Sequence, residues 1–318
     1  MSNTVSMGNW KLEVGETRFL HETHVQKLTQ LVEEWSSIET FIRKKDATPV
    51  WSVQNLNVPT ILCRVDMTPF EPDDSPEKGL FEVEARPAGF GILLNLFPEF
   101  KNIRAFWEPL APVGAVVLGS REVAAEDTRV FSKAMGWKWF EPQHCGNGIA
   151  KHVWVRGSEL DNKSVDLSRL EKRALAPVTS HGDKTYLLKM GLATPVHSPD
   201  ELSWDTPFVV KPQKGSKSDC VLLWHPQEKK KKTNGLYTKT KITNTLGQDR
   251  PFIKQSFMFP QEEKHQDKRG FTIWRIYFGY DIRTSKWRFA GGLWNWRPCL
   301  KVHGALDSIA GGLMKKTS

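Results

Sequence analysis

Two short segments in the first third of the chain alternate apolar and charged residues, the pattern of β-strands with one buried and one polar face. Residues 61–66, ILCRVD, place Arg64 and Asp66 on one face. Residues 81–86, FEVEAR, alternate in the same way, and the turn-rich residues 71–79 separate the two segments. The pattern predicts a β-hairpin whose charged side chains gather on one face.

The acidic residues of this hairpin suit a metal ion. Asp66 on the first segment and Glu82 and Glu84 on the second are hard oxygen ligands of the kind that Mg²⁺ accepts. Carboxylates gathered on one face repel one another unless a cation lies among them. Another interpretation is a solvated face on which Arg64 and Arg86 balance the acids, because antiparallel sheets commonly expose one polar face. The residues alone leave both interpretations open.

A basic segment in the second half of the chain has the features of a phosphate site. Residues 207–210, PFVV, are predicted to form a strand by their Phe and Val content, and this strand delivers Lys211 at a fixed place. Gly215 and Ser216 follow in a loop whose backbone N–H groups can approach phosphate oxygens. Although a lysine in such a place is often simply solvated, the combination indicates ATP as a ligand.

Arginines mark a third segment near the C-terminus. Residues 271–281 and 287–293 are predicted to form paired strands, and they carry Arg275, Arg288 and, just beyond them, Arg297. Arginine can hold a phosphoryl group or a carboxylate through two parallel hydrogen bonds, which lysine does less well. Each arginine taken singly is more often a surface charge. Together with the carboxylates and the lysine, the three arginines favour a nucleotide-dependent transferase.

These motifs occur in a characteristic order along the chain: RVD, FEVEARPAGFG, VWVRGSEL, FVVKPQKGSKS, PFIKQSF, WRIYFGYD and AGGLWNWRP. From about residue 61 onward, this order resembles the ATP-grasp superfamily, and more narrowly its circularly permuted, glutathionylspermidine synthetase-like type. In that type the carboxylates that hold Mg²⁺ precede the ATP-binding lid. The resemblance implies an α+β fold with a circularly permuted ATP-grasp core and a small α/β domain like the one that precedes the ATP-grasp fold.

The resemblance also implies roles for the residues of the hairpin. It gives Asp66 and Glu82 as magnesium ligands, and Arg64 as a catalytic cation near the transferred phosphate. Glu84 falls where the family pattern Glu-x-Asn has an asparagine. A carboxylate there still ligates magnesium, but it adds a negative charge to the site.

The nucleotide site implied by the resemblance lies in the second half of the chain. Lys211 is expected to contact the phosphates under a lid loop formed by residues 215–218, and Gln255 to lie near the adenine on the strand of residues 252–257. Lys184 stands where relatives often have a lysine that opens a helix ahead of the lid. A plain first-turn residue is an equally good interpretation of Lys184.

The activity that follows is the ATP- and Mg²⁺-dependent joining of a carboxylate to an amine through an acyl phosphate, with small-molecule or peptide substrates. A covalent nucleotidyltransferase of the RNA or DNA ligase kind is an alternative, because residues 232–235, KTNG, match its short lysine motif. A nucleic-acid-binding or catalytically silent relative is another. The net charge of +9, part of it in the lysine run 229–232, would attract ATP and nucleic acid alike.

The chain is predicted to divide into four parts. Residues 1–46 form a helical segment, residues 47–110 hold the carboxylate part of the ATP-grasp core, residues 111–178 form the small α/β domain, and residues 179–318 hold the lid and the arginine-bearing strands. The expected helix of the first part lies within residues 14–43, with Phe19 on its apolar stripe.

Composition adds little that is specific. A hydrophobic share of 39% over 318 residues is enough for a proper core. No apolar run has the length needed to cross a bilayer and the N-terminus lacks the form of a secretory signal, so we expect a cytoplasmic protein with no membrane partner. The four cysteines form no C-x-x-C pair, as expected of reduced thiols.

Tryptophan is abundant in this chain, with thirteen residues. Packing in the core explains most of them. Trp294 and Trp296 alternate on an expected strand beside Arg297, which leaves open a role as walls of an acceptor site.

Overall fold

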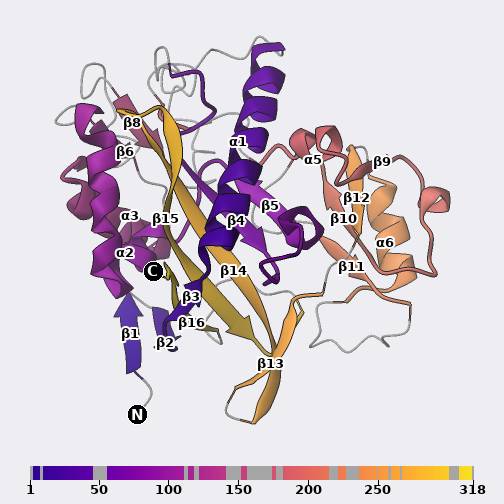
Figure 1. The fold of residues 1–318 in the computed structure, drawn as a ribbon. Coiled ribbons are helices and arrows are strands. Elements are labelled where there is room, and N and C mark those ends of the chain that lie inside the picture. Colours follow the sequence, from indigo (N-terminus) through magenta and orange to yellow (C-terminus); the bar gives the residue numbers. More distant parts are fainter. Residues whose placement is uncertain are drawn as a thin grey trace.

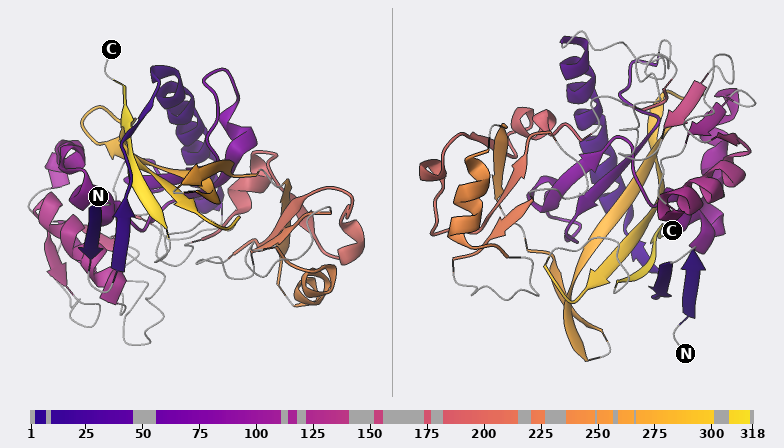
Figure 2. Two further views of the ribbon diagram at one scale, coloured as in Figure 1. Left: turned by 90° about the horizontal axis from the view of Figure 1, so that it is seen from below. Right: turned by 180° about the vertical axis from the view of Figure 1, so that it is seen from behind.

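The computed structural model describes residues 3–7, 10–45, 56–110, 114–117, 122–140, 152–155, 174–176, 182–214, 221–226, 236–248, 250–256, 259–265, 267–300 and 308–316. They form a mixed α+β fold with a large central sheet and two smaller sheets (Figure 1). Further views show one smaller sheet and its helices to one side of the large sheet, and the other to the opposite side (Figure 2). The predicted α+β class is confirmed.

Nine strands form the large sheet: β1 (Asn3–Met7), β2 (Trp10–Val14), β3 (Arg18–Leu20), β4 (Leu62–Met67), β5 (Leu80–Glu84), β13 (Gln261–His265), β14 (Lys268–Asp281), β15 (Lys286–Arg297) and β16 (Ile309–Lys315). Their order is β1-β2-β16-β15-β14-β4-β5, with β3 also on β16 and β13 also on β14. Strand β16 runs parallel to β2 and β3, and the other neighbours are antiparallel.

Two predicted strand pairs are confirmed in this sheet. The carboxylate hairpin is β4 paired with β5, and the short helix η1 (Pro76–Gly79) lies in its connection. The arginine-bearing pair is β14 with β15. Because β14 also pairs with β4, the two predicted pairs are neighbours in one sheet.

One face of the large sheet is covered by α1 (Glu22–Lys45), as Figure 1 shows. Leu28, Val32 and Trp35 recur at helical spacing and so form one apolar stripe. The stripe packs against side chains of alternate residues of β14, among them Ile276 and Phe278. The sheet is therefore closed by a hydrophobic core on this side.

The start of α1 corrects the sequence prediction. Phe19 does not lie on the apolar stripe of the helix: it belongs to β3, and 60% of its surface is exposed. The backbone of β3 pairs with Leu313, Met314 and Lys315 of β16, so strand pairing overrides the helical periodicity of this segment.

The opposite face of the large sheet packs in part against α2 (Phe90–Leu96), η2 (Pro98–Leu110) and α3 (Glu122–Met135). Helices α2 and α3 approach closely at Gly91, where a Cβ atom would lie 1.8 Å from the backbone oxygen of Asp127, so glycine is required. The three-stranded parallel sheet β7-β6-β8 adjoins them: β6 (Gly114–Val117), β7 (Lys138–Phe140) and β8 (His152–Val155).

The small antiparallel sheet has the order β11-β10-β12-β9 and consists of β9 (Thr194–Val196), β10 (Phe208–Pro212), β11 (Leu222–Trp224) and β12 (Phe252–Ser256). Three helices accompany it: α5 (Thr185–Lys189), η4 (Pro199–Glu201) and α6 (Lys239–Leu246). Phe208 and Val210 of β10 pack against Ile242 of α6. Strand alternation therefore turns Val209 and Lys211 to the other face.

Strand β10 differs slightly from its prediction. It extends through Pro212, so Lys211 lies inside the strand and does not emerge from its end. Pairing with Ile253 of β12 keeps the backbone of Lys211 extended.

Among the described residues, no helix combines the length and the apolar character that crossing a membrane requires.

Candidate active site

A row of charged residues crosses three strands of the large sheet. Asp66 of β4 lies directly opposite Glu82 of β5 on one side and Arg275 of β14 on the other. One step along the strands, Arg64 lies opposite Glu84. Residues paired in this way share one face of the sheet, so the charged face of the hairpin forms as predicted and Arg275 joins it.

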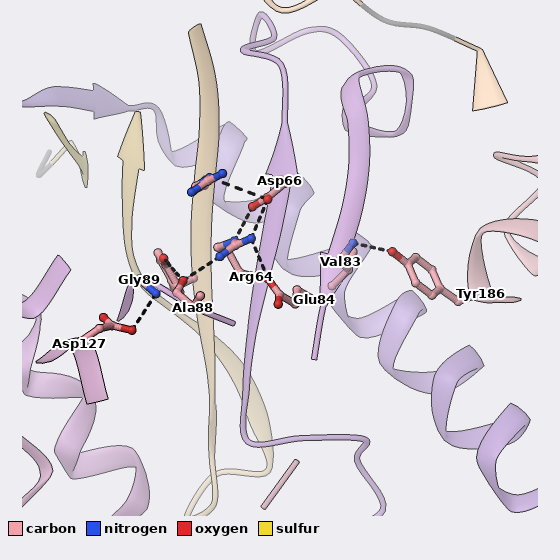
Figure 3. A network of polar contacts seen from close by, with 10 residues as sticks. Arg64, Asp66, Val83, Glu84, Ala88, Gly89, Asp127 and Tyr186 are labelled. Atoms are coloured by element: carbon pink, nitrogen blue, oxygen red, sulfur yellow. Dashed lines mark hydrogen bonds and ion pairs between the residues drawn. The ribbon is translucent and has the colours of Figure 1, made fainter. Parts of the chain in front are cut away.

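Arg64 is the centre of this charged face (Figure 3). Its Nε lies 2.5 Å from Oδ1 of Asp66, and its Nη2 lies 2.8 Å from Oδ2 of Asp66 and 2.7 Å from Oε2 of Glu84. Burial alone would lower the pKa of Arg64, but Asp66 and Glu84 together raise that pKa well above its usual value. Arg64 therefore stays charged and holds the carboxylates of Asp66 and Glu84 in place through hydrogen bonds and ion pairs.

The loop after β5 is fixed by the same arginine. Nη1 of Arg64 and the hydroxyl of Tyr277 both donate to the backbone oxygen of Ala88, at 2.7 and 2.9 Å. Burial raises the pKa of Tyr277 to about 12, so its hydroxyl keeps the proton that it donates. The next residue, Gly89, has a φ of 87° and donates its N–H to Oδ2 of Asp127 on α3. The charged face is thus tied to the helices beside it.

The pKa values of the two glutamates of β5 are shifted in opposite directions. Burial raises the pKa of Glu82, but the cations around it, Lys184 and Lys211 foremost, bring the pKa below its usual value. Glu84 has a raised pKa, because burial outweighs the attraction of Arg64. Glu82 is therefore the more firmly ionised of the two, among several cations.

The small sheet meets the large sheet at β5, the outer strand. Nζ of Lys211 donates to the backbone oxygen of Phe81 at 2.8 Å, and Nε2 of Gln255 donates to that of Leu80 at 2.7 Å. The exposed backbone of an edge strand is a natural place for such contacts. Burial lowers the pKa of Lys211 to about 8, although Glu82 acts in the opposite direction. Lys211 and Gln255, two of the residues predicted to bind nucleotide, thus lie together at the junction of the sheets.

Sequence reasoning missed a third contact at this junction. Tyr186 of α5 is buried, and its hydroxyl accepts a hydrogen bond of 2.6 Å from the backbone N–H of Val83. Burial raises the pKa of this hydroxyl well above its usual value. The signal available in the sequence was its position two residues after Lys184, in the segment expected to open a helix.

Lys184 is the residue at the N-terminal boundary of α5, where a helix-opening lysine was expected. It is buried, its backbone N–H donates to Gln213 at 2.8 Å, and its Nζ donates to the oxygen of Gly182 at 3.2 Å. Gly215 and Ser216, predicted to form the lid loop, lie outside the described residues.

The arginines of the third segment lie on the charged face. Nε of Arg275 lies 3.9 Å from Oδ2 of Asp66, too far for a hydrogen bond, and has no hydrogen-bond partner among the described residues. Arg297 lies opposite Phe271, four residues beyond Leu293, the partner of Arg275. Strand alternation places Arg297 on the same face but at a distance from the carboxylates.

Trp294 and Trp296 do not line this face, so the suggestion that they wall an acceptor site gains no support from it. Both are buried in the core beneath α1, and their indole N–H groups donate to the backbone oxygens of Glu16 and Glu263. Alternation turns the residue between them, Asn295, to the charged face. The W-N-W pattern was the signal that could have identified it.

The carboxylates fit magnesium only as part of a nucleotide complex. In the described part of the chain, no group of three or more His, Cys, Asp or Glu side chains is placed to hold a metal ion. Nucleotide-bound Mg²⁺, however, commonly takes one or two carboxylates besides the phosphates. Asp66 and Glu82, opposite each other on one face, meet that requirement, although Arg64 competes for Asp66.

Comparisons with known proteins give little further guidance. No family model matches the chain, and no curated protein matches its sequence. A solved structure from Methylobacillus flagellatus KT, provisionally assigned as a gamma-glutamylcysteine synthetase, is similar to this chain. The match covers 89% of this chain and 84% of the other, with 10% identity and a TM-score of 0.41. Values this low identify neither the superfamily nor the reaction.

Proposed function

We propose that this protein is an ATP-dependent carboxylate–amine ligase of the circularly permuted ATP-grasp type. The nucleotide binds at the junction of the small sheet and β5, with its phosphates directed toward the charged face. Lys184, Lys211 and Gln255 are the proposed nucleotide ligands of the described residues, together with Gly215 and Ser216 of the predicted lid loop.

One observation carries the proposal. Lys211 and Gln255 lie on neighbouring strands of the small sheet, on the face that meets β5, and β5 carries Glu82 beside Arg275 and Arg64. Phosphate-binding cations and carboxylates suited to Mg²⁺ therefore occupy adjoining strands of two different sheets. Nucleotide binding must replace the hydrogen bonds that Lys211 and Gln255 now make to the backbone of β5.

The chemistry consists of two transfers. A carboxylate oxygen of the acid attacks the γ-phosphorus of ATP, ADP leaves, and an acyl phosphate forms. The amine nitrogen then attacks the acyl carbon, the C–O bond to phosphate breaks, an amide forms, and one proton passes to solvent. Arg64 and Arg275 stabilise the charge on the transferring phosphoryl group, so the protein acts through positioning and electrostatics.

Asp66 and Glu82, with Glu84 beside them, are the proposed protein ligands of Mg²⁺, which when bound would neutralise charge on the phosphates. Arg64 holds Asp66 and Glu84 in position until then. Its guanidinium can also contact phosphate, because it presents several donors in one plane.

The test is nucleotide binding followed by turnover. Calorimetric titration of the whole chain with ATP should show binding that strengthens with Mg²⁺, and mixtures of carboxylates and amines should include a pair that releases ADP. Absence of ATP binding would overturn the proposal.

Two other functions give different results in the same assays. A covalent nucleotidyltransferase would retain label from α-labelled ATP on a lysine; its candidate motif, residues 232–235, lies outside the described residues. A nucleic-acid-binding protein, which the net charge of +9 favours, would bind RNA with strong salt dependence and would not need ATP.

A further inference from the structure

Asn295 is buried, with only 4% of its surface exposed, and its amide oxygen, Oδ1, lacks a hydrogen-bond partner among the described residues. Its cross-strand neighbours are Ile273 of β14 and Ala310 of β16, neither of which has a polar side chain. An apolar residue would pack at this position at lower cost, because buried polar groups in native proteins are normally hydrogen-bonded.

Asn295 also has a specific place on the charged face. On β15, Asn295 lies two residues before Arg297 and two residues after Leu293, and Leu293 pairs with Arg275 of β14. The diagonal from Asn295 to Arg275 spans roughly 7–8 Å between backbone positions, within the reach of an arginine side chain. Asn295 thus lies on the same face as Arg275, the residue that is proposed to contact the phosphoryl group, and one diagonal step from it.

The chemistry of these groups defines a complementary ligand. Oδ1 of an amide is an acceptor, so it must be met by an N–H or O–H donor. Guanidinium groups on either side are matched by oxyanions. The acyl phosphate supplies the oxyanion at Arg275. A molecule that carries an amino group next to a carboxylate then matches the two remaining groups, the amide oxygen of Asn295 and the guanidinium of Arg297.

We propose that Asn295 binds the amino group of the amine substrate, and that this substrate is an α-amino acid whose carboxylate is directed toward Arg297. The inference rests on the proposed function, since it takes the phosphoryl group to lie at Arg275. By accepting an N–H hydrogen bond, Asn295 fixes the amine so that its lone pair faces the acyl carbon. Asn295 is therefore a specificity-determining residue.

The experiment compares wild type with Asn295→Leu, which keeps the branched shape and the number of heavy atoms and removes the acceptor. Thermal unfolding is followed with Mg²⁺ and a non-hydrolysable ATP analogue, and then with each standard α-amino acid in addition. N-acetylated amino acids and the corresponding decarboxylated amines are the negative probes. Asn244→Leu, at an exposed position of α6, is the matched control.

At least one free α-amino acid should raise the unfolding temperature of wild type, and its N-acetylated form should not. Asn295→Leu should unfold at the same temperature as wild type or a higher one, keep its response to the ATP analogue, and bind the amino acid about tenfold more weakly or worse. Should the leucine variant not fold, Asn295→Ala provides the same comparison.

The outcomes separate this inference from the proposed function. A response to the ATP analogue without a response to any amino acid overturns the role of Asn295 and leaves the ligase proposal standing. An undiminished amino-acid response in both Asn295 variants also overturns it. An amino-acid response that is lost in the variant, without any response to the ATP analogue, supports the subsite and overturns the ligase proposal.

Discussion

The two faces of the large sheet are built from the same strands but carry different kinds of side chain. On β14, Ile276 and Phe278 point into the core beneath α1, whereas Arg275 and Tyr277 point to the charged face. On β15, Trp294 and Trp296 likewise alternate with Asn295. One face is closed by α1 and apolar side chains, and the other packs in part against α2, η2 and α3 and also carries ionised groups.

This difference separates stability from activity within one sheet. Burial of large apolar side chains is the main source of folding free energy. Buried ion pairs contribute little net stability, because desolvation offsets much of their attraction. The core face therefore holds the sheet together, and the charged face can retain groups such as Arg275 Nε and Asn295 Oδ1 that lack hydrogen-bond partners among the described residues.

The largest effect is expected on the core face. Trp35 is 1% exposed and makes edge contacts with Tyr186 and Trp287. Trp35→Ala should lower the free energy of unfolding by about 3–5 kcal/mol, measured by denaturant titration. Phe41→Ala, at a 63% exposed position of the same helix, should change it by less than about 0.5 kcal/mol.

If Trp35→Ala abolishes ATP binding in protein that is still folded, the core face contributes to activity as well as to stability, and the division between the two faces is wrong. Titration with ATP at denaturant concentrations below the unfolding transition distinguishes a loss of binding from a loss of folded protein.

Arginine variants on the charged face should affect turnover first. Arg275→Lys keeps the charge but loses the planar fork, so turnover should fall by about 10²-fold while stability changes little. Arg64→Lys should lower turnover similarly and also lower stability by about 1–3 kcal/mol, because Asp66 and Glu84 lose hydrogen bonds. Steady-state ADP release and denaturant titration measure the two effects.

Arg288→Lys, at an exposed position of β15, is the matched control and should leave both quantities unchanged. Wild-type turnover in both Arg275→Lys and Arg64→Lys would show that the charged face has no part in phosphoryl transfer.

Lys211→Ala should weaken ATP binding by roughly 10- to 100-fold, since one charge-assisted hydrogen bond to phosphate is lost. Its bond to the backbone of Phe81 is lost as well, so a small decrease in stability is expected. Calorimetric titration measures the affinity. Lys254→Ala, on the opposite face of the same small sheet, is the control and should bind ATP like wild type.

If Lys211→Ala binds ATP as tightly as wild type, the contact with Phe81 is the whole role of this lysine. The junction of the two sheets would then be a structural contact and not a nucleotide site.

Period-two alternation made much of the charged face predictable. The faces of Arg64, Asp66, Glu82 and Glu84 follow from local sequence, because a strand side chain has just two directions available. That β14 pairs with β4, bringing Arg275 opposite Asp66, does not follow, since strand order in a sheet is set by long-range packing.

Other features could not be deduced for the same reason. The hydrogen bonds between Arg64 and Asp66 depend on side-chain conformation. The contacts of Lys211 and Gln255 with β5 depend on how the two sheets pack against each other. Phe19 was misplaced because pairing with a strand almost three hundred residues away decides its backbone conformation. Local periodicity carries no information about such a partner.

The smallest predicted effect concerns His24, on the core side of the sheet. Its ring packs edge-on against Phe70 and Trp274, Nδ1 accepts the backbone N–H of His21, and Nε2 lies 2.9 Å from the backbone oxygen of Phe70. The neutral ring with its proton on Nε2 satisfies both contacts. Burial, with a smaller contribution from His21, lowers the pKa of His24 below its usual value, although Phe70 acts in the opposite direction.

Because the pKa of His24 is lower in the folded than in the unfolded chain, its contribution to stability is fully present above a pH of about 6.5 and falls as the pH drops toward the folded-state pKa. The slope due to this single group is at most about 1.4 kcal/mol per pH unit. Denaturant titration between roughly pH 7.5 and 5 should therefore show a smaller loss of stability in His24→Gln than in wild type. His21→Gln, at an exposed neighbouring position, removes only the smaller contribution of His21 and should stay close to the wild-type curve. Parallel curves for wild type and His24→Gln would mean that the ring accepts a second proton without cost, and the core face would then tolerate charge as the opposite face does.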